Sequence, residues 1–433
     1  MKFIKNQTVK KLTYLGIVLT ALTVSVIMSL DAQQPNSNYT LPMRNVDTVV
    51  NIKPLVLPLE VDSNTSTIEM PIDDLPNTAT TATAEPAKTS STRKIQIALI
   101  MDTSGSMEGL IEQAKSQLWN LVGELSHAKY DDKTPNLEIA LYEYGNDGLS
   151  SRGGYIRRIS PLISDLDDVS SALFSLRTNG GSEYCGMVIK KSLSGLEWSK
   201  SDDDIKLIFI AGNEPFTQGP VSYESACGDA RAKGVIVNTI HCGSYQEGIN
   251  GSWKSGAMIG GGDYMAIEQN RRTVYVQTPY DDRINECGEQ LNTTYIYYGK
   301  VGCAKKQAQE CEDSNAGSYS KSNLASRNSM KVSKFYEASS WDLVDAVEND
   351  KKSVAEVDKK TLAPELQKKT DAELEVYVKE QAKKRNALKK EIAELSVKRS
   401  EYIKAQNKAE GVDLQSSMVN AVKKQATAKN YSW

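Results

Sequence analysis

The chain has 433 residues, enough for one sizeable α/β domain with flanking segments. Its formal net charge is −3, and it has no broad basic stretch, so we do not expect it to bind nucleic acid. It contains two histidines, His127 and His241. Because neither is placed to activate a nucleophile, we expect no enzymatic activity.

Residues 1–32 have the pattern of an export signal. Four lysines precede a charge-free, largely apolar run from Leu12 to Leu30. That run is also long enough to span a bilayer, so the sequence predicts either a cleaved signal or a retained membrane anchor. In both cases we expect the rest of the chain to be exported, to the periplasm, the cell surface or the medium.

Residues 33–92 are predicted to be a linker. Their last part, Thr78–Thr92, consists mainly of threonine, alanine, serine and proline. Such a composition buries too little apolar surface to form a packed core. We therefore expect a disordered spacer before the folded domain.

A buried strand and a polar loop follow the linker. Ile95–Met101 is a nearly unbroken apolar run, which predicts a strand covered on both faces. The run ends at Asp102, and Ser104 and Ser106 follow at spacings of two. In an open α/β sheet this edge is where ligands bind, and carboxylate and hydroxyl oxygens suit Mg²⁺, Mn²⁺ or Ca²⁺.

The segment Asp102-Thr103-Ser104-Gly105-Ser106 resembles the Asp-x-Ser-x-Ser signature of von Willebrand factor type A (vWA) domains. In that family the signature opens the metal-ion-dependent adhesion site. The resemblance extends over roughly Arg93–Tyr298. It implies a divalent metal whose shell is completed by a carboxylate from a protein ligand.

Further strands and helices are predicted to alternate after this loop. Such alternation is typical of a doubly wound, mostly parallel sheet flanked by helices, and we assign it to residues 93–300. The expected strands are 137–145, 155–159, 205–211, 235–240 and 273–276. The expected helices are 110–126, 167–176, 222–233 and 281–291.

The resemblance implies two more metal-site elements. The family's threonine, which commonly follows two glycines, corresponds to Ser182, with Thr178 as a weaker alternative. The family's aspartate is absent, because Gly212 stands at its position. Glu214, two residues later, is our candidate for the missing carboxylate, as a direct or indirect ligand.

All six cysteines lie in the central part of the chain. An even number predicts disulfides in an exported protein and buried thiols in a cytoplasmic one. Given the export signal, we expect at least two disulfides, with Cys303–Cys311 favoured because these two residues enclose a short polar loop. The six are Cys185, Cys227, Cys242, Cys287, Cys303 and Cys311.

The remainder is predicted to be a polar, cysteine-containing extension at 301–340 and a helical tail at 341–433. Within the tail, Asp371–Lys408 has apolar residues at alternating spacings of three and four, which predicts a long helix or short coiled coil. Gln381, Arg385 and Arg399 interrupt the apolar stripe. The helix could dock on its own domain, form a helical hairpin, or bind a partner or a second copy.

These observations favour an extracytoplasmic binding module of vWA type that engages a protein ligand through a divalent metal. The alternative is a structural or assembly scaffold with an empty metal site, which interacts through its helical tail. Metal titration distinguishes the two.

Overall fold

The computed structural model describes residues 92–268, 270–271, 273–406 and 414–433. The predicted signal or anchor at 1–32 lies outside these residues, as does the linker up to residue 91. Within the described part, no helix is both long enough and apolar enough to cross a membrane.

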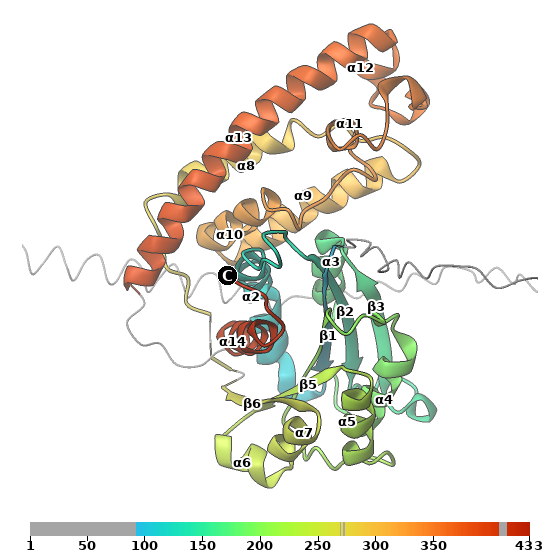
Figure 1. Cartoon of the computed structure of the whole chain (residues 1–433), viewed down its shortest axis with the longest axis vertical. Coiled ribbons are helices and arrows are strands. Elements are labelled where there is room, and N and C mark those ends of the chain that lie inside the picture. The colour runs from blue at the N-terminus through green and yellow to red at the C-terminus, as the bar shows by residue number, and fades with distance from the viewer. Residues whose placement is uncertain (1–91, 269, 272, 407–413) are drawn as a thin grey trace, which may run out of the picture. The chain divides into compact units, whose positions relative to one another are not determined.

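A six-stranded sheet forms the centre of the domain, with strand order β3-β2-β1-β4-β5-β6 (Figure 1). Neighbouring strands are parallel, except that β3 runs antiparallel to β2. This confirms the predicted doubly wound, mostly parallel α/β fold. The strands are β1 Lys94–Asp102, β2 Asn136–Tyr144, β3 Ile156–Ile163, β4 Ile205–Gly212, β5 Ile236–Cys242 and β6 Gly261–Ile267.

Helices cover both faces of the sheet, which explains the continuous apolar run of β1. Ile97 and Leu99 pack into one hydrophobic cluster together with α2, α3 and α14, whereas Ala98 and Ile100 belong to the cluster on the other face with α4, α5 and α7. The helices are α2 Glu108–Leu125, α3 Leu166–Ser175, α4 Cys185–Gly195, α5 Tyr223–Ala232, α6 Tyr245–Asn250, α7 Trp253–Ile259 and α14 Leu414–Thr427.

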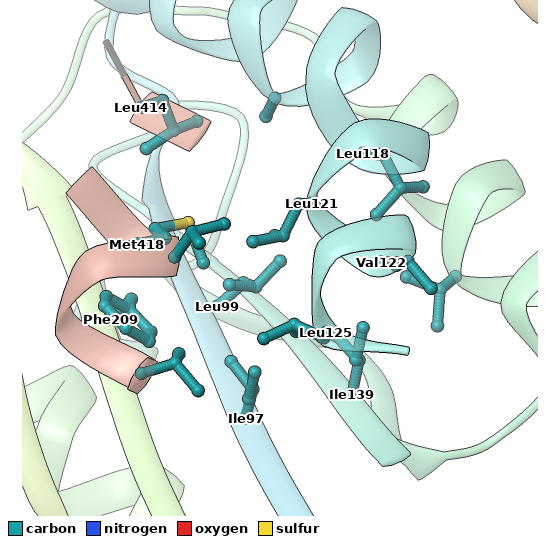
Figure 2. Close-up of a cluster of buried hydrophobic side chains, with 14 of the residues drawn as sticks. Ile97, Leu99, Leu118, Leu121, Val122, Leu125, Ile139, Phe209, Leu414 and Met418 are labelled. Carbon is teal, nitrogen blue, oxygen red and sulfur yellow. The ribbon is translucent and has the colours of Figure 1, made fainter. Parts of the chain in front are cut away.

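Helix α14 joins the sheet core although it follows β6 by almost 150 residues. Figure 2 shows Leu414 and Met418 of α14 beside Leu99 of β1 and Leu121 of α2. Polar contacts reinforce this packing, since Gln415 N–H donates to Gln117 Oε1 over 2.8 Å. The residue ranges expected for the separate domains stay predictions, but this packing shows that the C-terminal region returns to the sheet.

The chain between β6 and α14 forms a helical extension. Two hydrophobic clusters hold it together, one around α8, α10 and α13 and one around α11 and α13. Its helices are α8 Asp281–Asn292, α9 Gly302–Tyr319, α10 Lys321–Lys331, α11 Leu343–Glu348, α12 Pro364–Gln367 and α13 Asp371–Gln406.

The long helix α13 docks on its own chain. Its predicted apolar stripe is buried, with Leu374 and Val378 in one cluster and Leu388 and Ile392 in the other. Of the three alternatives open from the sequence, the structure therefore has the first. The arginines that interrupt the stripe take part in the docking, because Arg399 Nε donates to Asp281 Oδ1 over 2.8 Å.

Arg385 is the other interruption, and its side chain is fully buried. It pairs with Asp342 at 2.5 Å and with Asp345 at 2.6 Å, and it donates to the Thr294 hydroxyl over 3.0 Å. Buried charges are tolerated only when they are paired and hydrogen-bonded, and these contacts meet that condition.

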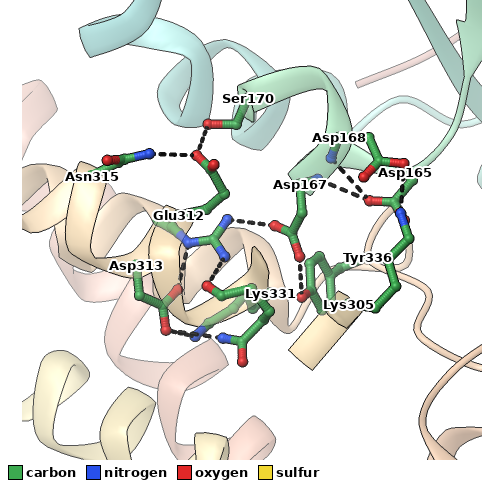
Figure 3. A network of polar contacts seen from close by, with 12 residues as sticks. Asp165, Asp167, Asp168, Ser170, Lys305, Glu312, Asp313, Asn315, Lys331 and Tyr336 are labelled. Atoms are coloured by element: carbon green, nitrogen blue, oxygen red, sulfur yellow. Dashed lines mark hydrogen bonds and ion pairs between the residues drawn. The ribbon is translucent and has the colours of Figure 1, made fainter. Parts of the chain in front are cut away.

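A second buried ionic network joins the extension to the sheet domain (Figure 3). Arg327 of α10 donates to Asp167 of α3 over 2.8 Å, and Lys331 pairs with Asp313 of α9 at 2.7 Å. Burial opposes ionisation of Asp313, but the charges of Lys331 and Arg327 outweigh it and hold the pKa of Asp313 below its usual range. The network fixes α9 and α10 against α3.

The structure corrects the predicted last strand. Residues 273–276 are not a strand, and the sixth strand is instead the glycine-rich segment Gly261–Ile267. A Cβ atom at Gly262 would overlap the backbone carbonyl of Val237 on β5. Glycine at this position therefore allows two strands to approach each other closely, and it does not mark a flexible loop.

The predicted disulfides are also wrong. All six cysteines are described, and all are free thiols, four of them buried. Cys303 and Cys311 both lie in α9, where eight positions correspond to about 12 Å along the axis. A disulfide needs a Cα–Cα distance of about 4.4–6.8 Å, so these two cannot pair.

The docking of α13 provides a stability test. We expect Arg385→Met to lower the free energy of unfolding by about 3–5 kcal/mol, because it leaves Asp342 and Asp345 buried without their cation. Arg283→Met is the matched control. Arg283 pairs with Glu391 of α13 at 2.7 Å, but both side chains are more than 40% exposed, so we expect a loss of about 0–1 kcal/mol. Urea denaturation followed by circular dichroism measures both, and equal losses would contradict this account.

Candidate metal site

Asp102 lies at the carboxyl end of the central strand and is fully buried. Its Oδ1 atom accepts a hydrogen bond of 2.7 Å from the Ser104 backbone N–H, which fixes the carboxyl group against the following loop. Its Oδ2 atom is buried and has no hydrogen-bond partner in the described structure. Such an unsatisfied buried oxygen is costly in a folded protein, so it points to a binding role.

The two predicted serines lie beside this carboxylate. Ser104 Oγ is 3.4 Å from Ser106 Oγ, and Ser106 donates to Asn213 Oδ1 over 3.4 Å. Ser104 precedes a short 3₁₀ helix, Gly105–Met107, but its hydroxyl does not cap that helix. The structure thus brings Asp102, Ser104 and Ser106 together, with hydroxyls that are not used for capping.

Ser182, the predicted counterpart of the family's threonine, is half-buried in the loop before α4. In the described structure neither it nor Thr178 forms a hydrogen bond with Asp102, Ser104 or Ser106. Its role as a ligand therefore stays a prediction.

Glu183, the residue after Ser182, supplies a carboxyl group that the sequence analysis missed. Its side chain is buried, and its Oε2 atom has no hydrogen-bond partner within the described residues. A Cβ atom placed on Gly145 would lie 2.7 Å from Glu183 Cγ and 2.8 Å from Asp102 Oδ1. Because one point lies close to both side chains, the side chains of Asp102 and Glu183 are neighbours beside Gly145.

Burial dominates the electrostatics of this pair. It raises the pKa of Asp102 to about 7, an effect that the Ser104 hydrogen bonds oppose and the Glu214 charge increases. Burial also raises the pKa of Glu183 to about 8, with further contributions from Asp102 and Glu214. The charges acting on the pair are thus all negative. A bound cation would relieve both the burial cost and this repulsion.

Glu214, our candidate for the missing carboxylate, is exposed. Its backbone carbonyl accepts a 2.9 Å hydrogen bond from Trp253 Nε1, which anchors the loop. Its negative charge contributes to the raised pKa values of both Asp102 and Glu183. Glu214 therefore lies at the rim of the site, and direct ligation by it stays a prediction.

Gly212 stands where the resemblance implies an aspartate, and the structure explains why none fits. A Cβ atom there would overlap the Tyr144 hydroxyl and lie 3.0 Å from Asp102 Oδ2. Tyr144 is fully buried, and its hydroxyl donates to the Ala211 carbonyl over 3.1 Å. The tyrosine thus fills the space that an aspartate would need, and Glu183 approaches Asp102 from another loop.

The residues present fit a divalent cation. Two buried carboxylate oxygens without partners lie next to two serine hydroxyls, and such hard oxygen donors suit Mg²⁺, Mn²⁺ or Ca²⁺. In the described residues, no group of three or more histidine, cysteine, aspartate or glutamate side chains is arranged to hold a metal. A site here must therefore use the hydroxyls of Ser104 and Ser106 together with the carboxylates of Asp102 and Glu183.

Sequence comparison gives no assignment, because no family model and no curated protein matches the chain. Among solved structures it is similar to BatB from Bacteroides thetaiotaomicron, with 17% identity and a TM-score of 0.31 over 40% of this chain and 90% of that one. It is also similar to the SpRpn10 VWA domain, with 14% identity and a TM-score of 0.31 over 40% and 87% of the two chains. A third is the pilus adhesin SpaC from Lactobacillus rhamnosus GG, with 14% identity and a TM-score of 0.29 over 41% and 28%.

The sheet domain has a vWA-like fold. The features that support this are the strand order of the sheet and the Asp102 loop at the carboxyl end of β1.

The unpaired carboxyl groups lead to a prediction on metal binding. We expect Asp102→Asn to abolish Mn²⁺ binding and Glu183→Gln to weaken it roughly tenfold or more, about 1.4 kcal/mol. Glu214→Gln should have a smaller effect, because Glu214 is exposed. Isothermal titration calorimetry measures all three, and an unchanged affinity in Glu183→Gln would remove that residue from the site.

The same variants should differ in stability. Without metal, Asp102→Asn should be more stable than the parent by about 1 kcal/mol, since it removes an uncompensated buried charge. Mn²⁺ at about 100 times its Kd should stabilise the parent by about 2.7 kcal/mol and leave Asp102→Asn unchanged. Glu143→Gln is the control. Glu143 is also buried but pairs with Arg157 and accepts from Thr103 over 3.3 Å, so its loss should destabilise the protein.

A side chain added at position 212 tests whether Tyr144 excludes one there. Gly212→Ala should cost about 1–3 kcal/mol through overpacking against Tyr144. Combining it with Tyr144→Phe should recover part of this loss, because the hydroxyl that is overlapped is then absent. A double-mutant cycle in urea denaturation measures the coupling, and additive effects would show that Tyr144 does not exclude a side chain at position 212.

Proposed function

We propose that this chain is a binding module of vWA type, which engages a protein ligand through a divalent metal held by Asp102, Glu183, Ser104 and Ser106. The observation that carries the proposal is the pair of buried carboxylate oxygens without partners at the carboxyl edge of the sheet. Ser182 and Glu214 stay candidate additional ligands.

The protein's own groups would have separate roles in binding the metal. Asp102, held by the Ser104 N–H, and Glu183 supply the negative charge from the buried side of the site. Ser106 is exposed, so the ion would be approached from that side. When bound, a divalent ion supplies an open coordination position that a carboxylate of the ligand can fill.

We propose binding without catalysis. A hydrolase of the nucleophilic type needs a nucleophile and a base within hydrogen-bond reach. His241 and Cys242 are adjacent on β5 and therefore point to opposite faces of the sheet, which supports a non-catalytic role. An extracytoplasmic location, with or without a membrane tether at residues 12–30, is proposed from the sequence alone.

The alternative is a scaffold with an empty metal site that interacts through its helical tail. The packing of α13 favours the metal-dependent module, because most of its apolar stripe is buried within the chain and is not available to a partner or a second copy.

A carboxylate probe tests the proposal. We expect N-acetyl-aspartate methylamide to tighten Mn²⁺ binding, and Mn²⁺ to tighten probe binding by the same factor, because the two effects are thermodynamically linked. N-acetyl-asparagine methylamide has the same shape without the charge and should have no effect. Calorimetric titrations in both orders measure the coupling. Absence of Asp102-dependent Mn²⁺ binding would refute the proposal and leave the scaffold alternative.

A further inference from the structure

A cavity of about 510 Å³ opens beside the metal site at the carboxyl ends of β4 and β5. Its lining comes from the loop after β4, from the end of β5 and from the turn between α6 and α7. Asn213 belongs to this lining and also accepts the hydrogen bond from Ser106. The cavity and the metal site thus share a wall.

The charge on the lining of this cavity is negative. Its lining includes one carboxylate, that of Glu247, and no lysine or arginine side chain among the described residues. Glu247 is held in place by a capping box, in which its carboxylate accepts from the Ser244 backbone N–H over 3.2 Å. Hydrogen bonds from Ser244 hold the pKa of Glu247 below its usual range, so the group is ionised at neutral pH.

His241 adds a second polar group with unused hydrogen-bonding capacity. Its side chain is only 4% exposed, and its Nδ1 atom has no hydrogen-bond partner in the described structure. A Cβ atom at Gly243 would lie 2.8 Å from His241 Nε2 and 3.5 Å from Glu247 Oε2. The imidazole and the carboxylate therefore flank the same small space.

Burial lowers the pKa of His241, although the Glu247 charge opposes this effect. The imidazole is therefore uncharged at neutral pH and does not neutralise Glu247.

We propose that this cavity binds a basic side chain, an arginine in preference to a lysine, of the protein ligand whose carboxylate reaches the metal site. The identity of the ligand rests on the proposed function, but the cavity itself does not. A guanidinium group carries five donors and no acceptor, which complements the Glu247 carboxylate and the amide and hydroxyl oxygens of the lining. Arginine also buries its apolar stem, which a cavity of this size accommodates.

The two histidines provide a direct assay on the full chain. His241 lines the cavity, and His127 is exposed after the end of α2, so their ring ¹H–¹³C signals serve as reporter and internal reference. The probe is N-acetyl-arginine methylamide. Its neutral counterpart is N-acetyl-citrulline methylamide, which has nearly the same shape. We expect the arginine probe to shift the His241 signal saturably and to leave His127 unchanged, and the citrulline probe to shift neither.

Two glutamates give a matched pair of variants. Glu247→Gln should weaken the arginine probe at least roughly tenfold, because it removes the charge, whereas glutamine preserves a capping box. Glu356→Gln is the control, since Glu356 occupies the same position in the capping box of Ser353 but does not line the cavity. It should leave the response unchanged.

The outcomes separate this inference from the proposed function. No saturable shift of His241, an equal response to citrulline, or an unchanged affinity in Glu247→Gln would overturn the cavity assignment. Asp102→Asn should lose Mn²⁺ binding and keep the response to arginine. If Mn²⁺ binding fails in the parent while the arginine response persists, the proposed function falls and the cavity remains a cation site. The aspartate and arginine probes should bind together, and mutual displacement would refute a second site.

Discussion

The burial of β1 on both faces is the constraint on which the site depends. Helices α2, α3 and α14 cover one side of this strand, and α4 and α5 cover the other. Solvent therefore does not reach the end of the strand before the chain enters the following loop. Asp102, its last residue, is therefore removed from water, and its carboxyl group must find a partner or a proton. Glu183 brings a second acid to the same point. The combination is unfavourable for an empty site and favourable for one that holds a cation.

Charge is handled differently in the helical extension. There Arg327, Lys331 and Arg385 are buried deeply, but each has a carboxylate within hydrogen-bonding distance. Buried ion pairs of this kind contribute little net stability, yet removing one partner is costly. Asp102 and Glu183, by contrast, are buried side by side without a cation in the described structure. This contrast supports a binding role for Asp102 and Glu183.

The sequence predicted the local part of the site because Asp102, Ser104 and Ser106 lie within five residues of one loop, and this short spacing brings their oxygens together. Glu183 could not be found in this way, since its direction depends on the course of the loop before α4. An acidic residue directly after the expected hydroxyl position was the available signal. Similarly, the sequence pattern did not predict the strand Gly261–Ile267. Glycines that permit close approach of two strands cannot be distinguished by pattern from glycines of a loop. The long helix was predicted from its period, but the partners of Arg385 and Arg399 lie in other helices.

The return of α14 to the sheet has a consequence for how the domain is made. Leu118 and Leu121 of α2 belong to the same core cluster as Met418, some 300 residues further along the chain. At synthesis rates of about 5–20 residues per second, that interval corresponds to roughly 15–60 s. Local helices form within microseconds, so α2 is formed long before the segment that covers it is synthesised. During this time the apolar face of α2 that packs against α14 stays uncovered. The fold is completed only after residues 414–427 have been synthesised.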